Sequence, residues 1–300
     1  MAKKNEEVST VRREKHGGIL TVIFAILSFL WIAPILIVFL NSFKRKAFIF
    51  THPFSLSCYS ITEGWDKFKA GITRAFCGWL NYSNGIRKTN LWECFGTSLF
   101  ITIGSVALII LCCSMCAWYI TRVHTKVTKT IYVLCLFSMI VPFQMVMFTL
   151  SKFANILHLS NPLGIIIVYL GFGAGLAVFM FTGFVKGISL EIEEAAMIDG
   201  CSPLQTFFKV VFPILKPTTV TVAILEAMWV WNDYLLPYLV LSSKYRTIPI
   251  AVQYLKQSHG QIDWGAMMAV LVLAILPIII FYIACQKYII EGVLAGAVKG

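Results

Sequence analysis

Residues 189–217 read SLEIEEAAMIDGCSPLQTFFKVVFPILKP, a charged stretch between two segments apolar enough to cross a membrane. Ser189 can accept hydrogen bonds from the free N–H groups of a first helix, and glutamates follow where the helix dipole favours negative charge. Gly200 is expected to end that helix. Ser202, followed by a proline and by a glutamine at the capping-box position, predicts a second short helix that runs to Pro213. The stretch therefore predicts a capped two-helix hairpin.

The first helix of this hairpin has a face of small and apolar side chains. Four residues at i, i+3, i+4 and i+7 spacing share that face: Ile192, Ala195, Ala196 and Asp199. Residues three and four positions apart lie on one side of a helix, and the alanines leave room for close approach, so we expect a docking ridge. The alternative is an ordinary amphipathic loop between membrane helices, which explains the caps but not the Glu-Ala-Ala spacing.

The hairpin resembles the EAA loop of the membrane subunits of bacterial ABC importers. The positions that match this motif are Glu194, Ala195, Ala196, Gly200 and Pro213, while Val210 and Phe212 replace its usual Ile and Leu. In that family the loop is the coupling element that seats in a cleft of the cytoplasmic ATPase. The resemblance implies ATPase-coupling roles for Ile192, Glu194, Ala195, Ala196, Asp199, Gly200 and Pro213.

The composition predicts an all-α, polytopic membrane protein. Hydrophobic residues make up 58% of the 300 residues and charged residues 13%, with a mean hydropathy of +0.80. Soluble domains average roughly 45–50% apolar and 25% charged residues. Six segments are long enough to span a hydrocarbon core of about 30 Å at about 20 residues each. They are residues 18–40, 97–120, 130–151, 163–185, 218–241 and 266–285, with the hairpin between the fourth and fifth.

The distribution of basic residues predicts that both termini are cytoplasmic. Five Lys and Arg residues precede the first span, and the positive-inside rule places that end in the cytoplasm; the inner side then holds 13 Lys and Arg and the outer side 12. The first span lacks a small-residue cleavage site, so we expect a retained helix. The expected layout is a cytoplasmic segment 1–17 and one membrane domain 18–300, with an outer loop 41–96 and a coupling loop 186–217. We expect a multi-pass protein in the lipid of a bacterial cytoplasmic membrane.

Other kinds of site are not favoured by the sequence. The net charge of +11 comes from basic residues scattered beside the spans, without an aromatic-interleaved patch, so no nucleic-acid partner is expected. Cys113 and Cys116 form a C-x-x-C pair without a second pair at zinc-finger spacing, so no metal site is expected. Cys58, Cys77 and Cys94 lie in the outer loop, where a disulfide between two of them is possible and leaves one free.

Polar residues at membrane depth are the candidates for a translocation pathway. Glu226 and Asp233 are the only carboxylates in the predicted spans, and they share one helix face with Trp229 between them. Each would cost about 2.5–3.5 kcal/mol if exposed to lipid, so both should face the bundle interior, a partner subunit or a water-filled path. Trp229, Trp231, Asn232 and Gln144 are further lining candidates, because flat apolar rings and amide groups are suited to sugar binding. The alternative is structural: Asn232 and Asp233 cap a helix break, and Glu226 pairs across a subunit interface.

Beyond the coupling loop the chain resembles the maltose-type carbohydrate importers, specifically their MalG-like permease subunit. The further matching segments are NSFK at 41–44, the Tyr119-to-Arg122 end of the second span, MIVPFQ at 139–144, WNDYLLP at 231–237, RTIPIAV at 246–252 and GAVKG at 296–300. The chain departs from the family at Thr97, where Asn is common, and in its enlarged outer loop.

This resemblance implies an ATP-driven importer with several partners. The expected partners are a MalF-like second permease subunit, two copies of a cytoplasmic ATPase, an external solute-binding protein and a carbohydrate substrate. The chain lacks a Walker lysine motif, so no catalysis and no bound cofactor are expected on it, and ATP and Mg would bind to the ATPase subunits. In the maltose-type relatives the C-terminal tail reaches the ATPase pair, which implies contact by Lys299 and Gly300.

Two other functions remain alternatives at this point. A secondary transporter or channel could use Glu226 and Asp233 as midplane ion-coupling groups, although such proteins often show repeats, and none is detected here. An ABC importer of amino acids or peptides would share the coupling loop. Association with an ATPase distinguishes the first alternative, and a panel of candidate substrates distinguishes the second.

Overall fold

The computed structural model describes residues 17–257 and 262–297, and all regular elements in those ranges are helical. In chain order the elements are α1 (Gly17–Ser42), α2 (Lys46–Ile49), a 3₁₀ turn (Ile61–Glu63), α3 (Trp65–Ala75), α4 (Leu80–Thr89), α5 (Leu91–Arg122), α6 (Lys126–Ile140), α7 (Phe143–Ile156), α8 (Pro162–Val185), α9 (Leu190–Ile198), α10 (Pro203–Thr206), a π-helical segment (Phe207–Val211), α11 (Phe212–Ile214), α12 (Lys216–Asn232), α13 (Leu235–Val240), α14 (Ile248–Gln257) and α15 (Trp264–Ala297). Residues 1–16 of the predicted cytoplasmic segment, and the tail residues Lys299 and Gly300, lie outside the described ranges.

Four helices in the described part of the chain are long and apolar enough to cross a membrane. They are Gly18–Ser42, Leu91–Arg122, Pro162–Val185 and Trp264–Lys287. These helices confirm the first, second, fourth and sixth predicted spans. Two bent helix pairs pass the same test, so the number of spans rises to six if each pair is one crossing.

The third predicted span, 130–151, is a bent pair of helices in the structure. The chain bends by 108° between α6 and α7, at Val141 and Pro142. Val141 has extended backbone angles, φ −73° and ψ 117°. A residue that precedes proline is driven out of the helical region by a steric clash with the proline ring, so α6 ends there.

The predicted fifth span, 218–241, also differs from the structure. Its main helix, α12, ends at Asn232, and the six-residue α13 follows after extended Asp233, with ψ 125°. A proline ring clashes with the carbonyl group four residues before it, and for Pro237 that carbonyl belongs to Asp233. At the other end, α12 meets the Pro203–Ile214 segment at a bend of 77°.

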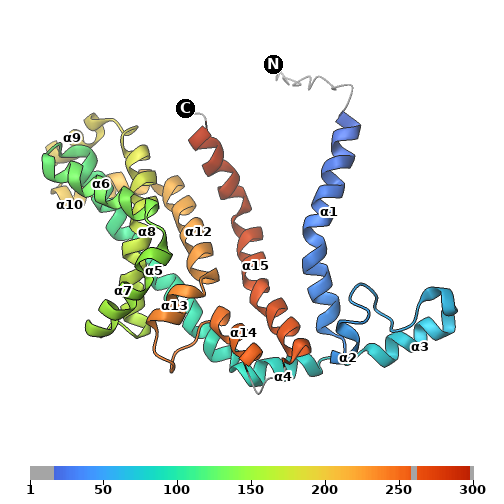
Figure 1. Ribbon diagram of the computed structural model, residues 1–300. Coiled ribbons are helices and arrows are strands. Elements are labelled where there is room, and N and C mark those ends of the chain that lie inside the picture. The colour runs from blue at the N-terminus through green and yellow to red at the C-terminus, as the bar shows by residue number, and fades with distance from the viewer. Residues whose placement is uncertain (1–16, 258–261, 298–300) are drawn as a thin grey trace, which may run out of the picture.

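The spans form a bundle in which α8 is the most buried. Half of the apolar window of α8 is buried, whereas none of the window of α1 is. Figure 1 shows α9 and α10 at one end of the bundle, the same end as the start of α1 and the last turns of α15. The short helices α2, α3 and α4 lie at the opposite end and run across the direction of the spans.

The predicted outer loop 41–96 folds onto the end of α1. Asn81 donates its side-chain amide to the carbonyl oxygens of Ser42 and Lys44, both at 2.8 Å. Lys44 is buried, and its ammonium group donates to Asn41 Oδ1 at 2.9 Å and to the carbonyl oxygen of His52 at 2.8 Å. Burial lowers the pKa of the Lys44 ammonium group. None of the nine cysteines forms a disulfide.

A glycine in the first turn of α8 provides a test of the packing. A Cβ atom on Gly164 would clash with the backbone of Leu159, and backbone cannot give way easily. We therefore expect Gly164→Ala to destabilise the chain by about 1–3 kcal/mol. The matched control is Gly183→Ala in the same helix, because a Cβ atom at Gly183 meets nothing within 4 Å. Thermal unfolding of the detergent-solubilised protein compares them, and equal melting temperatures would contradict the close contact.

Candidate functional site

The two-helix hairpin forms as its capping residues predict. Ser189 Oγ accepts from the N–H of Glu191 at 3.3 Å, and Gly200 ends α9 with φ +86°, a conformation that favours glycine. Ser202 and Gln205 form a reciprocal capping box at the start of α10. Beyond α10 the helix does not run regularly to Pro213: it passes through the π-helical segment and continues as α11.

One glutamate of α9 is buried and ion-paired, which the sequence does not reveal. The side chain of Glu193 is 2% exposed, and its Oε1 accepts from Arg122 Nη2 at 2.6 Å and from Arg122 Nε at 2.9 Å. Its Oε2 accepts from Trp118 Nε1 at 2.9 Å. Trp118 and Arg122 lie on one face of the last turn of α5, so Glu193 joins α9 to the end of that helix. In the sequence, Glu193 is one of three glutamates within four residues, and nothing there distinguishes it from Glu191 or Glu194.

The exposed face of α9 differs from the predicted ridge. Ala196 is buried at 9% exposure, so it faces the bundle, whereas Ala195, Ile192 and Asp199 are exposed. The four predicted residues therefore do not form a single exposed ridge. Glu194 is exposed. The sequence analysis missed Ile198, which is the most exposed apolar residue of the helix at 86%.

The second arm of the hairpin packs on the same end of α5. Phe207, fully buried in the π-helical segment, lies with its ring centroid 5.4 Å from that of Trp118. Phe207 belongs to a core cluster with Val211 and Leu215 and with residues of α5 and α8. Pro213, predicted to close the hairpin, is exposed.

Glu226 lies inside the bundle, not on an open face. It is 2% exposed, and its Oε2 has no hydrogen-bond partner among the described residues. A Cβ atom built on Gly173 would meet this oxygen at 2.9 Å, and would meet Ile109 Cδ1 at 2.6 Å. The carboxyl group therefore fills space between α12, α8 and α5 that only glycine on α8 leaves open. Glu226 thus faces the bundle interior, one of the three surroundings expected for it.

Asp233, Trp229 and Tyr169 meet near the break between α12 and α13. Tyr169 donates its hydroxyl to Asp233 Oδ2 at 3.1 Å, and its ring centroid lies 5.4 Å from that of Trp229. Asp233 Oδ1 accepts from the N–H groups of Leu235 and Leu236 at 3.0 and 3.4 Å. Asp233 therefore holds the start of α13, which is the part of the structural alternative that concerns this residue.

Two further lining candidates are exposed and separate from this cluster. Asn232 donates its side-chain amide to the carbonyl oxygen of Met228, at 2.7 Å, within its own helix. Gln144 lies in the first turn of α7, just after the bend. No hydrogen bond in the described part of the chain links Gln144 to Glu226 or Asp233.

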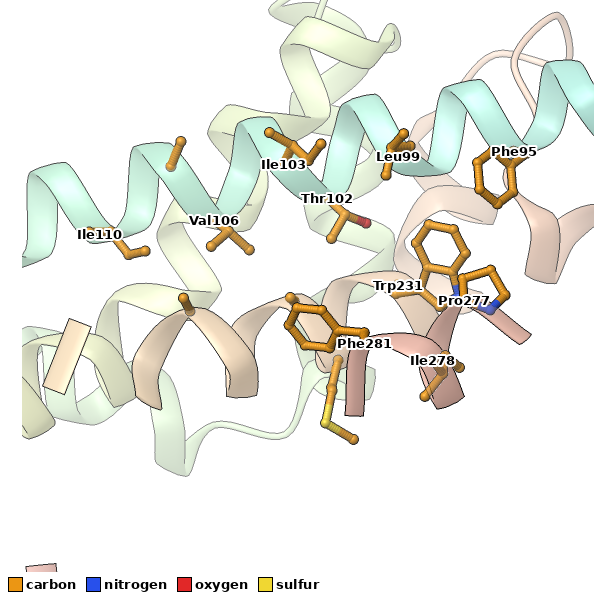
Figure 2. Close-up of a pocket in the computed structure, with 14 residues that line it drawn as sticks. Phe95, Leu99, Thr102, Ile103, Val106, Ile110, Trp231, Pro277, Ile278 and Phe281 are labelled. Atoms are coloured by element: carbon orange, nitrogen blue, oxygen red, sulfur yellow. The ribbon is translucent and has the colours of Figure 1, made fainter. Parts of the chain in front are cut away.

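A cavity of about 550 Å³ lies between α5, α12 and α15. Its lining is almost wholly apolar, and Figure 2 shows Trp231, Pro277 and Phe281 around it with Thr102 as a polar neighbour. Sugar binding requires several hydrogen-bonding groups around the hydroxyls. This cavity is therefore not suited to a sugar. Trp231 lines the cavity, whereas Trp229 contacts Tyr169. Within the described ranges, no group of three His, Cys, Asp or Glu side chains could hold a metal ion.

Comparison with known proteins identifies close relatives over nearly the whole chain. Residues 109–294 match the family model described as binding-protein-dependent transport system inner membrane component. The probable starch degradation products transport system permease protein AmyC of Thermoanaerobacterium thermosulfurigenes is 38% identical over 282 residues, 94% of this chain and 96% of AmyC. The multiple sugar-binding transport system permease protein MsmG of Streptococcus mutans is 32% identical, over 94% of each chain. The melibiose/raffinose/stachyose import permease protein MelC of Bacillus subtilis is 30% identical, over 96% of this chain and 99% of MelC.

A solved structure shares the fold. A chain from the crystal structure of a bacterial ABC transporter involved in the import of the acidic polysaccharide alginate superimposes with a TM-score of 0.69. The match covers 96% of this chain and 99% of the other, at 21% sequence identity.

Proposed function

Because this chain belongs to the family of binding-protein-dependent transport system inner membrane components, we propose that it is the membrane-spanning permease subunit of an ATP-driven importer of a sugar or oligosaccharide. In this proposal the chain itself is not catalytic. Two cytoplasmic ATPase subunits bind ATP and Mg, a second, MalF-like permease subunit completes the membrane part, and an external solute-binding protein delivers the substrate.

The observation that carries the proposal is the surface of α9. Outside the membrane-spanning helices, this short helix exposes Ile198, Ile192 and Leu190 together with small Ala195. Contiguous exposed apolar surface rimmed by polar residues marks an interaction site. Glu194 and Asp199, which are also exposed, add carboxylates to that surface, so α9 suits a docking helix that inserts into a cleft of an ATPase.

The orientation belongs to the same proposal. An ATPase is cytoplasmic, so the α9 end of the bundle would face the cytoplasm. The start of α1 and the end of α15 lie at that end as well (Figure 1), which agrees with cytoplasmic termini. The helices α2, α3 and α4 would then lie at the external surface of the cytoplasmic membrane.

The substrate class is proposed from the relatives. The names of AmyC, MsmG and MelC refer to starch degradation products, multiple sugars, and melibiose, raffinose and stachyose, respectively. We propose that Trp229, Asn232, Asp233 and Gln144 line the pathway, since an aromatic face and polar groups are suited to a sugar. Glu226, buried between helices of this chain, is proposed as a packing group instead.

Co-purification tests the main proposal. The tagged chain, extracted from its own host membranes in mild detergent, is expected to carry an ATPase, identified by mass spectrometry, in a ratio of two ATPase chains to one of this chain. The preparation should hydrolyse ATP, and vanadate should inhibit it. Substrate uptake by proteoliposomes that contain this chain without any ATPase would contradict the proposal and favour a secondary transporter.

A substrate panel tests the sugar separately. ATP hydrolysis by the reconstituted importer, with its binding protein, is expected to rise with one or more of maltose, melibiose and raffinose. Stimulation by amino acids or peptides, and by none of the sugars, would keep the importer but overturn the substrate class.

A further inference from the structure

The end of α5 holds both arms of the hairpin through two side chains. Arg122 and Trp118 together bind the carboxylate of Glu193, and the Trp118 ring packs on Phe207 of the second arm. Arg122 Nη2 also donates to the carbonyl oxygen of Ile188 at 3.0 Å, just after α8. We call Trp118, Arg122 and Glu193 the clamp. It joins α9 to two membrane-spanning helices at once.

The clamp is a built feature of the fold and not a surface ion pair. Glu193 is almost completely buried and Arg122 is 18% exposed, so water competes little for their hydrogen bonds. Every carboxylate oxygen of Glu193 has a donor, as a buried charge requires. The neighbouring Glu191 and Glu194 are exposed, and they have no side-chain partner among the described residues.

Helix α5, which carries Trp118 and Arg122, is continuous, whereas the connection from the hairpin to α12 is interrupted. Helix α5 runs unbroken from Leu91 to Arg122 and contains no proline. The second arm instead passes through a π-helical segment and a bend of 77° before α12 begins. Such interruptions are places where a helix can change direction. A displacement of α9 is therefore transmitted more rigidly into α5 than into α12.

At its far end α5 is attached to the segment after α13. The backbone N–H of Ile248, the first residue of α14, donates to Ser98 Oγ at 2.9 Å, and both residues are buried. The path along α5 from Arg122 to Ser98 is about 36 Å at about 1.5 Å per residue. This length is sufficient to cross a hydrocarbon core of about 30 Å.

We propose that the clamp is a positioning device that makes α9 and α5 one lever, through which movement at the hairpin reaches α14 and the break at Asp233. This inference rests on the proposed function for the source of the movement. Arg122, Trp118 and Glu193 act through other groups, because they touch neither the ATPase-facing surface of α9 nor the pathway candidates.

Hydrogen–deuterium exchange on the assembled importer in lipid nanodiscs tests this role. Exchange is compared without nucleotide and with ATP, Mg²⁺ and vanadate, in the hairpin and in residues 233–255. In Glu193→Gln, which preserves shape but removes the charge, ATPase retention and the nucleotide response of the hairpin should persist. The response of residues 233–255 should fall by about fivefold or more. Glu191→Gln, an exposed change in the same helix, should behave as the wild type.

Two conservative variants separate positioning from mere stability. Arg122→Lys keeps the charge and should retain part of the nucleotide response of residues 233–255. Trp118→Phe keeps the ring contact with Phe207 but removes the N–H donor, and should lose part of that response. If residues 233–255 respond to nucleotide equally in Glu193→Gln and in Glu191→Gln, the proposed role of the clamp is overturned. Failure of the wild type to carry an ATPase would instead refute the proposed function. In that case amide exchange of α9 without nucleotide still tests the clamp. If Glu193→Gln leaves the protection of α9 amides unchanged, the proposed clamp is overturned.

Discussion

Ala195→Trp is expected to leave the chain folded in the membrane but to release the ATPase. Ala195 is exposed on α9, so a large ring there costs the isolated chain little, yet it occupies the space that a docked surface needs. Loss of close contact at the centre of an interface costs about 2 kcal/mol or more, which corresponds to roughly 30-fold weaker association. Quantitative co-purification and uptake measure the loss.

The neighbouring alanine provides the matched control with the opposite expectation. Ala196 is buried against the bundle, so Ala196→Trp should lower the thermal stability of the chain itself, by about 1–3 kcal/mol of overpacking. Ala195→Ser, a small change on the docking face, should retain both stability and ATPase. Wild-type ATPase retention by Ala195→Trp would show that this face of α9 does not dock.

Glu226→Lys is expected to prevent accumulation of the folded chain. The longer side chain would have to fit beside Gly173, where the carboxyl group and Ile109 already fill the space that a Cβ atom would occupy. A cation at membrane depth costs about 2.5–3.5 kcal/mol, and overpacking adds about 1–3 kcal/mol. Their sum is a large share of a typical stability of about 5–15 kcal/mol. The amount of chain recovered from membranes as a monodisperse peak measures this loss.

Glu226→Gln should be tolerated. Its contrast with Glu226→Lys would show that the size and charge of the lysine side chain, and not the loss of the carboxylate, cause the instability. Glutamine has the same shape, and Glu226 has no cationic partner in either ion pair of the described residues, so no paired charge is lost. We expect near wild-type recovery and uptake. Normal recovery of Glu226→Lys would place the side chain in a water-filled path, and loss of uptake in a well-folded Glu226→Gln would restore a pathway role.

The features that were predictable depend on residues close together in the chain. The ends of α9 and the start of α10 follow from a serine cap, a glycine and a capping box, each of which acts within three or four residues. The four long spans follow from uninterrupted runs of apolar residues, because no other structure buries such a run in lipid. The EAA-like spacing likewise lies within one short segment.

The remaining features depend on contacts between distant segments, which local patterns do not encode. Pro142 was visible, but the 108° direction of the bend depends on packing of α6 and α7 against different neighbours. Ala195 and Ala196 are identical in the sequence, and only the packing of α9 on the bundle makes one exposed and the other buried. Among three similar glutamates, the fold selects Glu193, because the end of α5 brings Arg122 and Trp118 to that position alone. The sequence by itself determined where the long apolar helices lie and where the hairpin is capped, and only the tertiary structure decided which side chains of that hairpin face the membrane bundle.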